Sequence, residues 1–195
     1  MNSKSGDLLI KDEATELMRK DFEEAASRIK KAISSGRSVL IRYHNDADGI
    51  CSAVAMHKAI KEFSKELKGK VFFYQNNGAT YTTSEVMKDI SLLSTQEKNE
   101  RPLVIIMDFG ANEESFESIS LLKSAGCEII VIDHHPPSIN AKDADLIVSP
   151  WRYGGGSEYC AGYLSAEVAR QIADVEVLEI ARVALTGDMS KLIEK

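Results

Sequence analysis

Residues 103–137 read LVIIMDFGANEESFESISLLKSAGCEIIVIDHHPP and decide the fold class. Two short apolar runs within this stretch, LVIIMD at 103–108 and EIIVID at 128–133, are continuous and rich in β-branched residues. Such runs are typical of strands that are buried on both faces of a parallel sheet. Between them, residues 114–124 carry apolar side chains at helical spacing. The stretch therefore predicts strand, helix and strand in succession, which is the repeating unit of an α/β fold.

The same alternation extends outward from this stretch in both directions. Three further apolar runs predict strands at residues 38–43 (SVLIRY), 70–75 (KVFFYQ) and 146–149 (LIVS). The aromatic residues Phe72, Phe73 and Tyr74 are expected in the core of their strand. Helical spacing predicts helices at residues 12–35, 50–67, 84–93, 158–173 and 175–186. We therefore expect an α/β fold in which a doubly wound, mainly parallel five-stranded sheet carries helices on both faces.

The length of 195 residues fits one α/β domain. We divide it into an N-terminal helix (1–36), the α/β sheet core (37–150) and a glycine-rich loop followed by helices (151–195). Apolar residues make up 44% of the chain and charged residues 28%, which is typical of a globular domain and argues against disorder.

Composition also limits the classes of function. The formal net charge of −6 disfavours a broad basic face that binds DNA without regard to sequence. No apolar run approaches the ~20 residues of a membrane span and the N-terminus lacks a signal pattern, so we expect a cytoplasmic protein with no membrane contact. The three cysteines are widely spaced and form no CxxC pair, which favours reduced thiols over disulfides or a thiolate zinc site.

A first group of chemically active residues lies at 42–49 (RYHNDADG), directly after the first predicted strand. If the strand alternation continues, His44, Asp46 and Asp48 point to a common side and can converge on a metal ion. Alternatively, Asp46 or Asp48 merely caps the next helix, which is a common role for an aspartate before an apolar run. The combination His-x-Asp-x-Asp favours the metal site.

Three more motifs carry acidic or imidazole side chains, and two of them also stand at the ends of predicted strands. Asp108 follows the most apolar run, and Asp133, His134 and His135 follow another and precede two prolines that make a rigid turn. Asp188 follows a helical segment in the string LTGD. Taken singly, each motif is also explained as a turn, a helix cap or a surface pair. Jointly they favour a site, because sites in open α/β sheets form at the carboxyl ends of the strands.

The side chains gathered in these motifs offer oxygen and imidazole ligands and no thiolate. This chemistry favours Mn²⁺ or Mg²⁺ over structural zinc, and the set is large enough for two ions. Two ions would support phosphoryl hydrolysis by orienting a hydroxide in line with the leaving oxygen. The candidate ligands are His44, Asp46, Asp48, Asp108, His134 and Asp188.

The four motifs, in this order, resemble those of the DHH phosphoesterase superfamily, which is named after the string Asp133-His134-His135. The string HNDADG at 44–49 looks most like that of archaeal RecJ-like single-strand exonucleases. Family II pyrophosphatases and oligoribonuclease-type relatives usually have a histidine where this chain has Arg42. Bacterial RecJ typically has an aspartate at the position of His44.

The resemblance implies that two metal ions share one carboxylate. The bridging ligand would be Asp108. The first ion would have the ligands His44, Asp46 and Asp108. The second ion would have the ligands Asp48, Asp108, His134 and Asp188.

The resemblance also implies roles in handling the substrate. His135 would contact the scissile phosphate, and Asp133 would orient the two histidines that follow it. Residues 152–162 (RYGGGSEYCAG) resemble the loop that follows the DHH motif in the family, and Arg152 would contact phosphate there. The alternative for this segment is a flexible connector.

These implications favour a metal-dependent exonuclease that degrades single-stranded DNA or RNA, 5′ to 3′, to nucleoside monophosphates. A second hypothesis changes the substrate to short oligonucleotides, a cyclic dinucleotide or pyrophosphate. A third is a replisome scaffold, because archaeal relatives bind the GINS replication complex, although the presence of every expected ligand favours catalysis. Family members usually continue into a C-terminal DHH-associated domain, so we expect the chain to be a fragment that holds the catalytic half.

Overall fold

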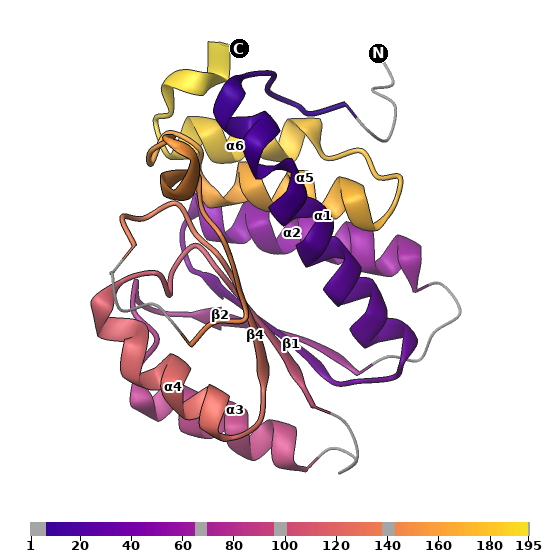
Figure 1. Ribbon diagram of the computed structural model, residues 1–195, viewed down its shortest axis with the longest axis vertical. Coiled ribbons are helices and arrows are strands. Elements are labelled where there is room, and N and C mark those ends of the chain that lie inside the picture. The colour runs from indigo at the N-terminus through magenta and orange to yellow at the C-terminus, as the bar shows by residue number, and fades with distance from the viewer. Residues whose placement is uncertain (1–6, 65–69, 96–100, 138–142, 195) are drawn as a thin grey trace.

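Five parallel strands form the centre of the computed structural model, which describes residues 7–64, 70–95, 101–137 and 143–194 (Figure 1). The strands are β1 (Val39–His44), β2 (Val71–Asn76), β3 (Leu103–Met107), β4 (Glu128–Ile132) and β5 (Leu146–Val148). Their spatial order is β2-β1-β3-β4-β5, and every neighbouring pair is parallel. The predicted fold class is confirmed, and the sheet is entirely rather than mainly parallel.

Helices cover both faces of the sheet, as predicted (Figure 1). The helices on the first face are α1 (Glu13–Ser34), α2 (Ala47–Phe63) and α5 (Ala161–Ile172), and α6 (Leu178–Gly187) packs on α2 and α5. The helices on the second face are α3 (Thr83–Ser94) and α4 (Phe116–Ser124). The short 3₁₀ helices of the described residues are η1 (Glu113–Ser115), η2 (Pro150–Tyr153) and η3 (Lys191–Glu194).

The observed helices differ from the prediction mainly at their N-termini. α2 begins at Ala47, earlier than expected, because a side-chain oxygen of Asp46 accepts a hydrogen bond from the backbone N–H of Gly49 (2.9 Å) and caps the helix. α5 and α6 begin later than expected, at Ala161 and Leu178. The predicted end of the helix at 50–67 lies outside the described residues.

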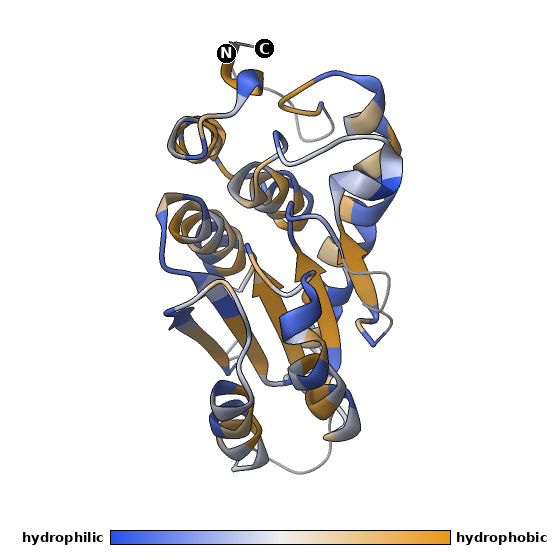
Figure 2. Cartoon of the chain, turned by 90° about the vertical axis from the view of Figure 1, so that its left-hand side faces the viewer, coloured by the Kyte–Doolittle hydropathy of each residue, from blue (hydrophilic) through white to orange (hydrophobic). Residues whose placement is uncertain are grey.

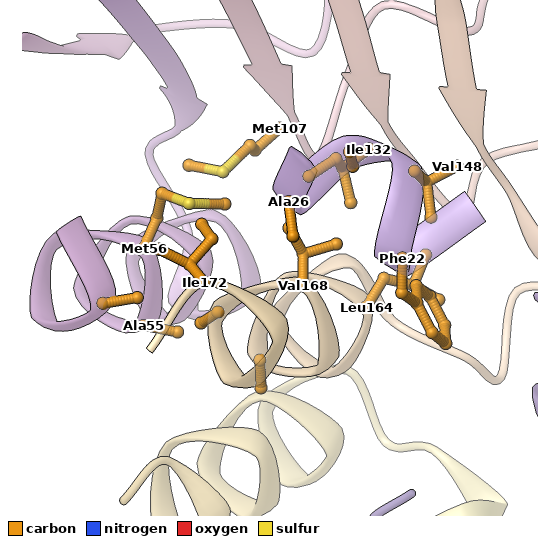
Figure 3. Close-up of a cluster of buried hydrophobic side chains, with 14 of the residues drawn as sticks. Phe22, Ala26, Ala55, Met56, Met107, Ile132, Val148, Leu164, Val168 and Ile172 are labelled. Carbon is orange, nitrogen blue, oxygen red and sulfur yellow. The ribbon is translucent and has the colours of Figure 1, made fainter. Parts of the chain in front are cut away.

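Alternate residues of the strands face the two helical layers. In β1, Val39 and Ile41 pack with α1, α2 and α5, whereas Leu40 packs with α3 and α4. Every side chain of β3 is buried. Figure 2 shows the apolar strands enclosed between helices, and Figure 3 shows Phe22 of α1 beside Leu164 of α5 in the larger core. The sheet is thus held rigid from both sides, which fixes the positions of its strand ends.

Other expectations about single residues have mixed outcomes. All three cysteines are free, as predicted, and they are buried. The prediction of a core position is wrong for Tyr74, which is 44% exposed because β2 is an edge strand. Within the described ranges, no helix has the length and apolar character that crossing a membrane requires.

We predict that Phe22→Ala lowers the free energy of unfolding by about 3–5 kcal/mol, because it opens a cavity in the larger core. Phe22 has no exposed surface. Leu17→Ala on the same helix is the matched control, since Leu17 is 48% exposed, and should cost about 0.5 kcal/mol or less. Urea unfolding followed by circular dichroism measures both values, and equal losses would contradict the packing of α1 on the sheet.

Candidate metal centre at the carboxyl ends of the strands

The predicted site residues lie where the chain reverses its course across the sheet. From β1 the chain passes to β2 on one side, and β3 then starts the other half of the sheet on the opposite side of β1. Ligands of open α/β sheets bind at such a switch point. His44 is the last residue of β1, Asp108 directly follows β3, and Asp133 directly follows β4.

The His44 ring lies between two aspartates. Its Nδ1 atom is 2.7 Å from Asp46 Oδ2 and 3.5 Å from Asp108 Oδ2. The other oxygen of Asp46 caps α2, so this residue both caps the helix and lies at the site. Burial raises the pKa of Asp46, but the Gly49 N–H and His44 outweigh this effect and hold the pKa below its ordinary value.

Asp108 is the most constrained residue of the group. Its backbone is left-handed, with a φ of 65°, a conformation that aspartate and asparagine tolerate better than other residues with a side chain. It is 1% exposed, and Oδ2 has no hydrogen-bond partner among the described residues. Burial raises the pKa of Asp108 to about 9; the hydrogen bond with His134 opposes this shift, and the carboxylates of Asp48 and Asp46 add to it.

His134 approaches the same carboxylate from β4. Its Nε2 atom lies 3.4 Å from Asp108 Oδ1 and 3.7 Å from Asp48 Oδ2, and its Nδ1 atom lies 3.6 Å from Asp188 Oδ2. The Nδ1 atom is also 2.7 Å from the carbonyl oxygen of Ser157. A proton on Nδ1 that is donated to this carbonyl leaves the lone pair of Nε2 free toward the carboxylates, which is the arrangement of a metal-binding histidine.

Asp48 is held by the N-terminus of α5. Its Oδ2 and Oδ1 atoms accept hydrogen bonds from the backbone N–H groups of Ala161 and Gly162, both at 2.7 Å. A Cβ atom on Gly162 would lie 2.4 Å from Cβ of Ala184 and 2.9 Å from Asp48 Oδ1, so only glycine permits this close approach. The partial positive charge of the helix N-terminus stabilises the carboxylate.

Asp133 is completely buried and holds His135. Its Oδ1 atom lies 2.7 Å from Nδ1 of His135 and accepts the backbone N–H of the same residue, while Oδ2 accepts the N–H of Ala111 (2.9 Å). The hydrogen bond to Asp133 raises the pKa of His135, and the His135 side chain is 44% exposed. Of the two histidines, Asp133 therefore contacts His135, while His134 is held by Ser157.

The glycine-rich loop contains contacts that the sequence did not reveal. Arg152 donates hydrogen bonds to Asp21 of α1 (3.2 Å) and to the Ile147 carbonyl (2.8 Å), so the structure pairs it with α1. The neighbouring Trp151 instead contacts the motif, since its Nε1 donates to the carbonyl oxygen of His134 (2.8 Å). No local pattern marks this contact, because it depends on how the loop folds back over the end of β4.

Among the residues that the structure describes, two groups of side chains have the geometry to hold a metal ion, with their ligand atoms within 4.8 Å of one another. The first is His44, Asp46 and Asp108, the set implied for the first ion. The second is Asp108, His134 and His135, which includes the residue implied to contact phosphate.

Asp108 belongs to both groups. A bound cation would satisfy its Oδ2 atom, which has no hydrogen-bond partner in the described part of the chain. The residues present therefore fit two hard cations that share this carboxylate.

Comparison with known proteins identifies the family. The model of the DHH family, N-terminal domain, matches residues 38–187. The chain belongs to the DHH family. The resemblance inferred from the four motifs is confirmed.

Relatives of this DHH domain are longer proteins. It is 33% identical to an uncharacterized protein of Methanocaldococcus jannaschii, over 94% of the chain and 27% of the relative. It is 29% identical to the single-stranded-DNA-specific exonuclease RecJ of Bacillus subtilis, over 69% of the chain and 16% of RecJ. The chain thus spans about a quarter or less of these curated relatives.

Solved structures share its fold. The DHH domain of a member of the s1p family of ribosomal proteins has a TM-score of 0.90 and 30% identity, over 97% of this chain and 48% of that one. RecJ from Thermus thermophilus, solved in complex with Mn²⁺, has a TM-score of 0.58 and 19% identity, over 77% of this chain and 20% of that one. The second likeness concerns the fold alone.

We predict that Asp108→Asn removes most of the dependence of the melting temperature on Mn²⁺. At a Mn²⁺ concentration of ~100 Kd, wild type should melt about 5–10 °C higher than in EDTA, because the ion binds the folded state only. In EDTA the variant should melt at a higher temperature than wild type, because the substitution removes a crowded, buried carboxylate and asparagine tolerates the left-handed backbone. Mn²⁺ should change the melting temperature of the variant little.

The matched control is Asp174→Asn, which changes an exposed acid outside the cluster and should respond to Mn²⁺ like wild type. Differential scanning calorimetry gives all the melting temperatures. A wild-type melting temperature that Mn²⁺ leaves unchanged would argue against the metal centre.

Proposed function

We propose that this DHH domain is a metal-dependent phosphodiesterase of the RecJ-like type, which hydrolyses single-stranded DNA or RNA to nucleoside monophosphates from the 5′ end. The observation that carries the proposal is the buried Asp108 carboxylate. Two potential metal groups share it, and one of its oxygens has no hydrogen-bond partner within the described part of the chain. The likeness to a RecJ that is specific for single-stranded DNA supports the class of substrate, and the oxygen and imidazole ligands support Mn²⁺ or Mg²⁺ as the cofactor.

In this proposal the chain supplies ligands to two sites around Asp108. Two Mn²⁺ or Mg²⁺ ions, when bound, supply Lewis-acid stabilisation of the phosphate and lower the pKa of water. The ligands of the first ion are His44, Asp46 and Asp108. The ligands of the second ion are Asp48, Asp108, His134 and Asp188. A carboxylate oxygen of each of the three aspartates lies within 3.7 Å of a nitrogen atom of the His134 ring.

His135 contacts the scissile phosphate in this proposal. Asp133 fixes its Nδ1 atom and raises its pKa, so the exposed part of the ring can donate a hydrogen bond from Nε2 to a phosphate oxygen. Asp133 itself is buried and acts through His135 as a positioning residue. Arg152 remains a predicted phosphate contact, which its side chain would make by leaving Asp21.

The test is hydrolysis of end-labelled single strands of several lengths by the purified chain, first with Mn²⁺ and then with EDTA. We expect stepwise release of nucleoside monophosphates from the 5′ end with Mn²⁺ and none with EDTA. Dinucleotides and pyrophosphate, assayed in parallel, separate the exonuclease from enzymes of shorter substrates. Hydrolysis that persists in EDTA, or faster hydrolysis of pyrophosphate than of any strand, would contradict the proposal.

We predict that His135→Ala lowers kcat by about a hundredfold or more, because it removes a hydrogen-bond donor to the phosphate. Its Mn²⁺-induced rise in melting temperature should persist, since the ligands of both proposed ions remain. His57→Ala is the matched control, because His57 is exposed on α2 and contacts the Phe73 ring. Steady-state kinetics on one short strand measures the effect, and equal kcat values for the two variants would exclude His135 from the reaction.

A further inference from the structure

Trp151 is the one tryptophan of the sequence, and the structure leaves it 42% exposed beside the DHH motif. The polar edge of its ring is already satisfied, because Nε1 donates a hydrogen bond to the carbonyl oxygen of His134. This carbonyl belongs to the peptide that joins His134 to His135. The indole is therefore tied to the residue next to the proposed phosphate contact, with part of its surface open to solvent.

The loop around Trp151 is fixed in place by the same motif. Ser157 donates from its hydroxyl to the His134 carbonyl (3.1 Å) and accepts at its own carbonyl from the His134 ring (2.7 Å). On the other side, Arg152 and Tyr153 both donate to Asp21 of α1. These contacts hold η2 between the motif and α1, so the indole needs little ordering when a ligand arrives.

We propose that Trp151 stacks on a nucleobase of the bound strand, next to the phosphate that His135 contacts. The inference rests on the proposed function and adds the residue that recognises the base. Aromatic rings bind bases of any sequence by stacking, which suits an enzyme that must accept every nucleotide. The chain has a net charge of −6, so it attracts the phosphates of a strand less than a basic nucleic-acid-binding protein does. Base stacking would supply binding energy that electrostatic attraction does not.

The first test uses Trp151 as its own probe. Its emission, excited where the bases do not absorb, is followed while dAMP or deoxyribose 5-phosphate is added to the wild-type chain. Both ligands carry the same sugar and phosphate, and only dAMP carries a base. Quenching by dAMP alone is the expected result, because stacking brings the base onto the ring. Equal responses to the two ligands, or no response to either, would overturn the proposal.

The second test compares variants on a short strand and on an abasic strand of the same length. Trp151→Ala should lower the preference for the base-containing strand, taken as the ratio of kcat/KM values, by about 5- to 150-fold. Trp151→Phe keeps a ring but loses the N–H donor, and should retain most of the preference. The proposal is wrong if Trp151→Phe loses as much of the preference as Trp151→Ala. It is also wrong if each variant lowers kcat/KM equally on the two strands, because Trp151 then only positions His134.

Tyr74→Ala is the matched control, since Tyr74 is similarly exposed but lies on β2 over Arg42. It should leave the preference unchanged, and a loss as large as that of Trp151→Ala would overturn the assignment to Trp151. The two proposals fail separately. Quenching by dAMP without hydrolysis of any strand would disprove the exonuclease and support base stacking. Hydrolysis without quenching would support the exonuclease and disprove base stacking.

Discussion

Burial of the Asp108 carboxylate beside Asp46 and Asp48 is the constraint on which the site depends. An ionised carboxylate inside a protein is strongly destabilising unless hydrogen bonds or a cation compensate for the lost water. Within the described ranges, one oxygen of Asp108 has no such partner, and the pKa of Asp108 is raised. Burial lowers the pKa of His134, but the neighbouring carboxylates outweigh this effect and raise it to about 10. Without cations, the raised pKa values of Asp108 and His134 favour their protonated forms, and metal binding would release these protons.

Helix N-termini allow the other carboxylates to stand so close to Asp108. Asp46 caps α2, and both oxygens of Asp48 accept hydrogen bonds from the first turn of α5. The positive ends of these helices offset part of the repulsion among the aspartates. Because α5 follows β5 along the chain, the site requires both the sheet and the helices after it. Gly162 makes this possible by letting α5 approach Asp48 closely.

The strands and the convergence of the motifs could be predicted from the sequence because both follow from local patterns. Apolar runs mark the strands, and parallel strands present their carboxyl ends at one edge, which brings His44 and Asp108 together. The remaining features depend on contacts between distant segments. The hydrogen bonds of Asp48 to α5 span more than a hundred residues, and no local pattern encodes them. The resemblance of residues 152–162 to the family's loop implies a phosphate contact for Arg152, but its partner Asp21 lies on a helix far away in the chain.

The sharing of Asp108 by two ions is tested most directly by anomalous diffraction from crystals of the domain grown with Mn²⁺. Data collected at the manganese absorption edge locate the ions independently of the protein density. We predict two anomalous peaks, each at coordination distance from a carboxylate oxygen of Asp108. A single peak that does not touch Asp108, or no peak at a saturating concentration of Mn²⁺, would contradict the shared-carboxylate centre.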